Sequence, residues 1–315
     1  MTENSRVIIL MCSHLCCGLE TVPLDQSEWT ALSDKLAALR RAPSDMLRFS
    51  DGDFAAVLGL GASESVRYRR LLDRTDRIAA ECARLQKLGV DIITEDDGRY
   101  PKRLRDKLDR LAPPMLYCCG DPSVLDGDFL GIVGSRDIDS SDAEFAENLA
   151  TTAVGKGFGI VSGGARGVDT AAADAVMKCG GKIVEFIADS MLRRMKSRGV
   201  SRRLRDGKHV MLSVTMPDAA FHIGMAMQSN KYIYSQSLGT VVVRTEYKRG
   251  GTWAGATENI RQNRSATYCL DKPDYPGNVA LIGMGAIPIG ADFDPDTVRG
   301  EKSEASVKQL SFFDF

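Results

Sequence analysis

The chain has 315 residues, of which 43% are hydrophobic and 26% are charged. This composition is ordinary for a folded globular protein of about two domains, and it excludes the disordered, collagen-like and disulfide-scaffolded classes. The 41 Lys and Arg residues balance 42 Asp and Glu residues, so a uniformly basic nucleic-acid coat is excluded, whereas a local basic patch is not.

The N-terminal segment predicts neither a membrane anchor nor an export signal. Its apolar run from Val7 to Met11 is preceded by Glu3 and is much shorter than the ~18 apolar residues that span a bilayer. We therefore expect a cytoplasmic protein with reduced cysteines. The cluster of Cys12, Cys16 and Cys17 lacks the paired spacing of a zinc site. It favours small apolar residues at the end of a strand, with no metal or other cofactor.

Residues 1–92 are predicted to form a helical domain. The apolar side chains of Trp29, Leu32 and Leu36 recur at helical spacing within a candidate helix over 27–41. Residues 54–72 have the pattern helix, Gly-x-Gly, helix. This pattern is compatible with a helix-hairpin-helix, which places backbone N–H groups against a phosphate, and equally with an ordinary turn in a small bundle.

Beyond residue 92, short runs rich in Val and Ile alternate with helical stretches. The runs expected to be strands are 130–134, 159–162, 183–187, 210–214, 240–243 and 267–270. Nearly continuous hydrophobicity is typical of strands buried on both faces, and alternation with helices predicts a doubly wound α/β domain with a parallel sheet. We place this domain at 93–290 and expect the polar residues 291–315 to form a flexible tail.

Two successive strand ends lead into helices through glycine-bearing loops. The residues of interest are Gly134, Ser135 and Arg136 in the first loop, and Ser162, Gly163, Gly164 and Arg166 in the second. Glycines let the backbone approach a ligand, helix N-termini offer N–H donors, and arginines bind phosphate oxygens, so these loops predict an anion pocket. Ser141 and Glu144 predict a capping box for the helix after the first loop. Neither a G-x-G-x-x-G nor a GxxxxGK[ST] motif is present, which disfavours an NAD enzyme or an NTPase.

The chain resembles the DNA-processing protein A (DprA/Smf) family over about residues 93–275. The matching stretches are Tyr100-Pro101-x-x-Leu104, Pro113-Pro-Met-Leu-Tyr117-x-x-Gly120, Gly134-Ser-Arg136, Ser162-Gly-Gly-Ala-Arg-Gly-Val-Asp169 and, more distantly, Ser229-Asn230-Lys231 and Gly251-Thr252. The resemblance implies an extended Rossmann-like core behind a small sterile-alpha-motif-like domain. It also implies a homodimer that binds single-stranded DNA and delivers it to the recombinase RecA without catalysis. Asn230, Lys231, Gly251 and Thr252 thereby join the two loops as candidate DNA-binding residues.

The chain departs from the family pattern at several positions. Ser229 and Lys231 stand where the family has the two arginines of Arg-Asn-Arg, and Gly250 stands where it has Ser before Gly-Thr. The match does not include the winged helix that ends many relatives. One alternative is a regulator or antitoxin paired with a toxin or phage-defence partner. Another is a Rossmann-like protein that binds or hydrolyses a nucleotide derivative, although Gly255 stands where the acid of such hydrolases belongs and Glu258 follows three residues later.

A basic stretch runs from Arg193 to Lys208, with eight positive residues and only Asp206 opposing them. It predicts a patch for phosphate backbones, with Arg202 and Arg203 as candidate contacts, and the alternative is a solvated helix face. Single-strand binding also requires rings for base stacking. The candidate rings are Phe221, Tyr232, Tyr234, Tyr247 and Trp253, of which Trp253 is the one best placed in an exposed loop.

The C-terminal residues resemble the peptide that binds the bacterial sliding clamp. The matching residues are Gln309, Leu310, Phe312 and Phe313. Phenylalanines on a polar tail require either a groove on a partner or the surface of their own protein. The sequence therefore predicts clamp binding or self-docking.

Overall fold

The computed structural model describes residues 1–18 and 21–300, which form two compact units. The first unit comprises Met1–Cys119 and Val214–Pro217, and the second comprises Gly120–Ser213 and the described residues from Asp218 onward. The sequence suggested a boundary at residue 92. In the structure residues 93–119 belong to the first unit, where β2 (Met115–Cys119) pairs antiparallel with β1 (Val90–Thr94).

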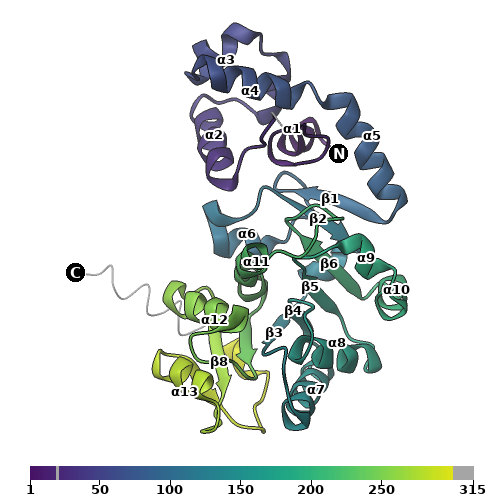
Figure 1. The fold of residues 1–315 in the computed structure, drawn as a ribbon, viewed down its shortest axis with the longest axis vertical. Coiled ribbons are helices and arrows are strands. Elements are labelled where there is room, and N and C mark those ends of the chain that lie inside the picture. Colours follow the sequence, from purple (N-terminus) through teal and green to yellow (C-terminus); the bar gives the residue numbers. More distant parts are fainter. Residues whose placement is uncertain (19–20, 301–315) are drawn as a thin grey trace, which may run out of the picture. The chain divides into compact units, whose positions relative to one another are not determined.

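The first unit is mainly helical (Figure 1). Its helices are α1 (Glu3–Cys12), α2 (Gln26–Ala38), α3 (Asp51–Leu58), α4 (Ala62–Leu72), α5 (Thr75–Lys87) and α6 (Lys102–Leu108), with short 3₁₀ helices at Pro43–Arg48 and Asp109–Leu111. No helix in the described part of the chain is long and apolar enough to cross a lipid bilayer.

The apolar run at the N-terminus is helical, and the expectation of a strand ending at the cysteine cluster is wrong. Val7 to Met11 are buried on every side of α1. A helix that is apolar all round reads in sequence like a buried strand, so a run of this length does not distinguish the two. The loop after α1 is organised by Arg74, whose guanidinium donates to the carbonyl of Leu15 at 2.6 Å and to Cys17 Sγ at 2.6 Å.

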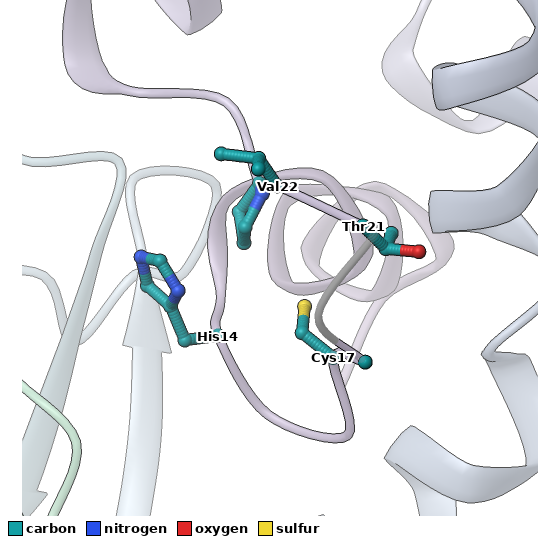
Figure 2. A pocket seen from close by; sticks show the side chains of 6 residues that line it. His14, Cys17, Thr21 and Val22 are labelled. Carbon is teal, nitrogen blue, oxygen red and sulfur yellow. The ribbon is translucent and has the colours of Figure 1, made fainter.

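A pocket of about 430 Å³ lies beside this loop. Figure 2 shows His14, Cys17, Thr21 and Val22 in its lining. Within the described residues no group of His, Cys, Asp and Glu side chains is arranged to hold a metal ion.

The second unit contains a sheet of parallel strands. These are β3 (Phe129–Val133), β4 (Gly159–Ser162), β5 (Ile183–Phe186), β6 (His209–Ser213), β7 (Gly239–Val242), β8 (Ala266–Leu270) and β9 (Ile287–Ile289). Their order is β6-β5-β4-β3-β7-β8-β9. The six predicted strands are therefore confirmed, each within one residue of its predicted bounds. The three-residue β9 was not predicted, because two of its residues are exposed and give no apolar run.

Helices cover both faces of this sheet. They are α7 (Ser140–Gly155), α8 (Val168–Lys178), α9 (Met191–Met195), α10 (Arg198–Arg205), α11 (Ile223–Gln236), α12 (Gly250–Gln262) and α13 (Pro276–Gly283), with a 3₁₀ helix at Pro122–Asp126. α7 and α8 lie side by side and pack on β3 and β4 (Figure 1). α11 packs on the same two strands as well as on β5 and β7, and therefore occupies the opposite face. The architecture is the predicted doubly wound α/β fold.

Residues 291–300, expected to begin a flexible tail, are packed against the second unit. Val298 is buried in the main apolar cluster of this unit, and the ring of Phe293 lies 5.0 Å from that of Tyr268. Lys156 forms ion pairs with Asp294 at 2.5 Å and Asp296 at 3.0 Å. The two ion pairs join segments about 140 residues apart, and local composition does not reveal such contacts. The clamp-like residues Gln309, Leu310, Phe312 and Phe313 lie outside the described residues.

Neighbouring strands β3 and β7 mark the point where the winding of the sheet reverses. The chain continues from β3 through α7 to β4 on one side, and from β7 through α12 to β8 on the other. In an open α/β sheet, such a point leaves a crevice outside the carboxyl ends of the strands. The two glycine-bearing loops leave β3 and β4 at this edge.

Candidate nucleic-acid interface

The first loop, Gly134 to Arg136, is held from both sides. The Thr252 hydroxyl donates to the Gly134 carbonyl at 2.8 Å, and the Ser135 amide donates to the Arg244 carbonyl at 2.9 Å. A Cβ at Gly134 would lie 2.4 Å from a methyl group of Val168, so only glycine allows the close approach of the two loops. The structure thus brings together Gly134, Ser135 and Thr252.

The second loop is closed by its own aspartate. Asp169 Oδ2 accepts hydrogen bonds from the amides of Gly163 at 3.0 Å and Ala165 at 3.1 Å. Burial raises the pKa of Asp169 to about 7, although these two amides act in the opposite direction. The Gly164 amide points to the hydroxyl of Ser162 at 3.4 Å. The expected cradle of free backbone donors is therefore largely occupied by the protein's own oxygens.

The N-terminus of α7 is likewise occupied, and the predicted capping box of Ser141 and Glu144 is wrong. The cap is Asp139, whose Oδ1 accepts from the Ser141 amide at 2.9 Å and the Asp142 amide at 3.1 Å. Aspartate is among the strongest N-cap residues. The pairs Asp139/Asp142 and Ser141/Glu144 both have capping-box spacing and begin two residues apart, so the sequence alone does not decide between them. A carboxylate at this helix end disfavours a phosphate there, so anion binding falls to side chains.

Two arginines provide the open positive charge at this edge. Arg136 and Arg166 are exposed, and among the described residues no carboxylate lies within ion-pair distance of either. The Arg136 guanidinium lies 5.1 Å from the centroid of the Phe221 ring. A depression of about 660 Å³ beside Arg136 is lined by Arg136, Asp137, Ile138, Asp139, Gly167 and Arg244.

Arg244, in contrast, is neutralised. Its Nη1 lies 2.9 Å from Asp142 Oδ2 and 3.3 Å from Asp139 Oδ2. The hydrogen bond to Asp142 raises the pKa of Arg244. Tyr275 donates to the other oxygen of Asp142 at 2.6 Å, so this fully buried carboxylate is satisfied from two directions. The open cation of the depression is therefore Arg136.

The candidates on α11 and α12 form one contact group. Asn230 Nδ2 donates to the Gly251 carbonyl at 2.8 Å, and a Cβ at Gly255 would lie 2.8 Å from that of Asn230. Thr252, one residue further, reaches the first loop. Lys231 is half-buried, and this burial lowers its pKa, although the negative charge of Glu258 acts to raise it. Ser229 is 4% exposed and donates to the Met225 carbonyl, so its hydroxyl serves α11 instead of a ligand.

The basic stretch forms α9 and α10, and its arginines have different surroundings. Arg202 is exposed, whereas the Arg203 side chain is 13% exposed and lies 3.5 Å from Asp174. The charge of Arg203 also stabilises the ionised form of the buried Glu185. Burial acts to raise the pKa of Glu185, but His209, 3.0 Å away, together with Arg203 and Arg194, lowers it. Arg203 is therefore a packing residue and not an open phosphate contact.

Arg194 is a site residue that the sequence did not single out. Its Nη1 donates to the Gly164 carbonyl at 2.7 Å, and its Nε lies 2.5 Å from Asp189 Oδ1. Arg194 thereby holds the second loop at the Gly164 carbonyl. Its membership of the basic stretch was the available signal, but the stretch does not tell which arginine turns inward. Among the described residues, no hydrogen bond or ion pair links Arg202 or Arg203 to either loop.

These positions predict different results for two alanine variants. Arg202→Ala is expected to weaken binding of single-stranded DNA and to reduce the slope of log K against log salt by about 0.7, the value for one lost phosphate contact. Arg203→Ala is expected to keep the slope and to lower the free energy of unfolding by about 1 kcal/mol. Anisotropy titrations in a salt series and urea unfolding measure the two effects. Equal salt slopes for wild type and Arg202→Ala would remove α10 from the interface.

The candidate stacking rings also divide by burial. Tyr232 and Tyr234 are 3% and 2% exposed and belong to the core. Phe221 and Tyr247 are 44% and 52% exposed. Trp253, the preferred candidate from sequence, is half-buried and packs edge to face with Tyr247 at 5.3 Å between ring centroids.

The hydrolase alternative concerns two positions, Gly255 and Glu258, and both have structural partners. At Gly255, the position of the acid in such enzymes, the missing side chain makes room for Asn230. Glu258 lies 2.8 Å from Arg264, whose side chain is 7% exposed. The carboxylate nearest to the expected position of the acid is thus engaged by an arginine.

The sequence profile of the family described as DNA recombination-mediator protein A matches residues 91–293. The chain belongs to this family. A DNA processing protein DprA from Bacillus subtilis (strain 168) is 27% identical over 208 residues, which cover 65% of this chain and 69% of that protein. The chain is thus a recombination-mediator protein of the DprA type, whose family is not known for enzymatic activity.

Solved structures share the fold. DNA processing protein A from Streptococcus pneumoniae superposes with a TM-score of 0.68 at 20% identity, covering 92% of this chain and 95% of that one. DNA processing protein A from Helicobacter pylori, described for its single-stranded DNA binding mode, has a TM-score of 0.55 at 20% identity, covering 68% and 96% of the two chains.

Proposed function

We propose that this protein binds single-stranded DNA through its phosphate backbone at the loops that follow β3 and β4, and hands the strand to a recombinase. The observation that carries the proposal is the pair of open arginines, Arg136 and Arg166, at adjoining strand ends. Membership of the recombination-mediator family and the binding mode described for the Helicobacter pylori protein support it.

The proposed binding mode relies on guanidinium groups held by a rigid frame. Asp169 closes the second loop and Thr252 fixes the first, so Arg136 and Arg166 project from backbone that does not need to be ordered on binding. Ordering costs reduce affinity, and preorganised donors avoid them. Lys231 adds positive charge on α11 next to Asn230, and Arg202 adds an exposed positive charge on α10. Several positive charges favour a polyanion over a single small anion.

The experiment is a titration of labelled oligothymidylate and of a matched duplex in a salt series. Wild type is expected to bind the single strand more tightly than the duplex. Arg136→Ala is expected to bind it about 10- to 100-fold more weakly, because a charge-assisted hydrogen bond contributes ~1.5–3 kcal/mol. The matched control is Arg261→Ala, an exposed arginine on the last turn of α12, and it should bind like wild type. Absence of wild-type binding at low salt would overturn the proposed function.

The proposal includes a homodimer that delivers the strand to RecA. Exposed apolar side chains at one edge of the second unit support self-association: Val279 on α13, Met284 after it and Ile287 on the edge strand β9 are 37–48% exposed. Exposed apolar groups beside an edge strand are typical of an interface. Clamp binding by the C-terminal residues, and pairing with a toxin or phage-defence partner, stay predictions of the sequence.

A further inference from the structure

The loop between β7 and α12 presents an aromatic ring to solvent. Tyr247 is 52% exposed, and its ring packs edge to face with that of Trp253, with an interplanar angle of 74°. In a T-shaped pair the partner covers at most one face of a ring, so Trp253 supports Tyr247 without enclosing it. The Lys248 ammonium also lies over this ring, at 5.0 Å from its centroid. A tyrosine that is half exposed buries little apolar surface, so the hydrophobic effect does not explain why Tyr247 stands at this position of the loop.

The backbone of the loop has a defined conformation. Lys248 has a φ of 55°, in the left-handed region that a side chain adopts at a cost of ~1–2 kcal/mol. The following Gly250 has a φ of 82° and begins α12. Arg249 and Glu246 face each other across the turn at 3.7 Å. The ring is therefore carried on a shaped turn and not on an extended linker.

Two basic residues follow the ring in the loop. The Lys248 ammonium lies 5.0 Å from the centroid of the Tyr247 ring, and the Arg249 side chain is 84% exposed. The acid of this loop, Glu246, lies against Arg249. An exposed ring with a lysine ammonium over it suits a nucleobase with its phosphate, because the base can stack on the ring in place of the ammonium while the ammonium pairs with the phosphate.

The partner of this ring, Trp253, is adjacent in sequence to residues of the candidate interface. Trp253 follows Thr252, whose hydroxyl holds the first loop, and Gly251 receives the hydrogen bond from Asn230. Arg136 is two residues beyond the Gly134 carbonyl that Thr252 holds, so a strand bound by Arg136 would pass close to the start of α12. Phe221, the other exposed ring, already has the Arg136 guanidinium over it.

We propose that Tyr247 is a stacking platform for a nucleobase of the bound single strand, supported by Trp253. This inference rests on the proposed function, to which it adds a base contact outside the two loops.

The test compares Tyr247→Leu and Tyr247→Phe in the full chain, using oligothymidylate and an abasic oligonucleotide of equal length. Tyr247→Leu is expected to bind oligothymidylate about 5- to 100-fold more weakly, and Tyr247→Phe within about twofold of wild type, because stacking requires the ring and not the hydroxyl. The slope of log K against log salt should be equal for all three proteins, since no phosphate contact is lost. On the abasic strand, wild type and Tyr247→Leu should bind equally.

The outcomes separate the two proposals. If wild type binds oligothymidylate and Tyr247→Leu binds it equally well, the stacking platform is refuted and the proposed function stands. A loss that persists on the abasic strand also refutes stacking, since it points to the backbone. If wild type binds neither strand, the proposed function fails and the stacking platform fails with it.

Discussion

Between about pH 4 and pH 7, this protein is expected to lose stability relative to its Asp169→Asn variant by about 1.4 kcal/mol per pH unit. Burial raises the pKa of Asp169 from 3.8 to about 7. Below pH 4 the carboxyl is neutral in the folded and unfolded states, and its burial costs little. As the pH rises, the unfolded chain releases the proton while the folded chain retains it, so folding becomes less favourable. Above pH 7 both states are ionised, and the difference is constant at about 4 kcal/mol.

Urea unfolding of wild type and Asp169→Asn over this pH range measures the difference. Asparagine retains one oxygen to accept from the amides of Gly163 and Ala165 and introduces no charge, so the second loop should persist. Asp274→Asn, at an exposed position of the same unit, controls for the loss of one carboxylate. Parallel stability curves for wild type and Asp169→Asn would show that Asp169 carries no penalty for ionisation in the folded state.

Gly167→Ala is expected to lower the free energy of unfolding by about 3 kcal/mol or more and to disrupt both loops together. Gly167 has a φ of 77° and a ψ of −126°, a conformation available essentially to glycine alone. A Cβ there would lie 2.3 Å from the Ser135 carbonyl oxygen and 2.8 Å from that of Arg136. These are backbone atoms, so the first loop must shift and move Arg136 with it.

The matched control for this variant is Gly155→Ala. Gly155 is the last residue of α7, and apart from its chain neighbours and the backbone of its own helix nothing lies within 4 Å of the position of its missing Cβ. Alanine there should stabilise the chain by ~0.5–1 kcal/mol, because it reduces the freedom of the unfolded state. Urea midpoints give both values, and oligothymidylate titration reports on the loop. Equal midpoints for the two variants would contradict the close approach of the loops.

The fold was more predictable than the site, for reasons visible in particular residues. The strands 159–162 and 183–187 were predicted within one residue because strands buried on both faces are apolar throughout. α1 was missed because a short helix buried on all sides has the same apolar signature. β1 and β2 were missed because their antiparallel pair interrupts the alternation of strand and helix that identified the rest.

Within the site, residue types were informative and their partners were not. The glycines and arginines of the two loops indicated an anion pocket, but nothing local showed that Asp139 and Asp169 satisfy the surrounding amides. Arg202 and Arg203 are neighbours of the same type, and only their positions on α10 separate the exposed one from the one beside Asp174.

The order of apolar runs and glycine turns was sufficient by itself to specify a parallel α/β core with functional loops at one edge, because the period of hydrophobicity is a local property. Tertiary structure decided which cations remain open to a ligand and which are neutralised. Charge pairing depends on side chains that are distant in the chain, as when Arg244 meets Asp142 across 102 residues and Thr252 meets Gly134 across 118. Such pairs form only when the strands that carry them become neighbours in the sheet.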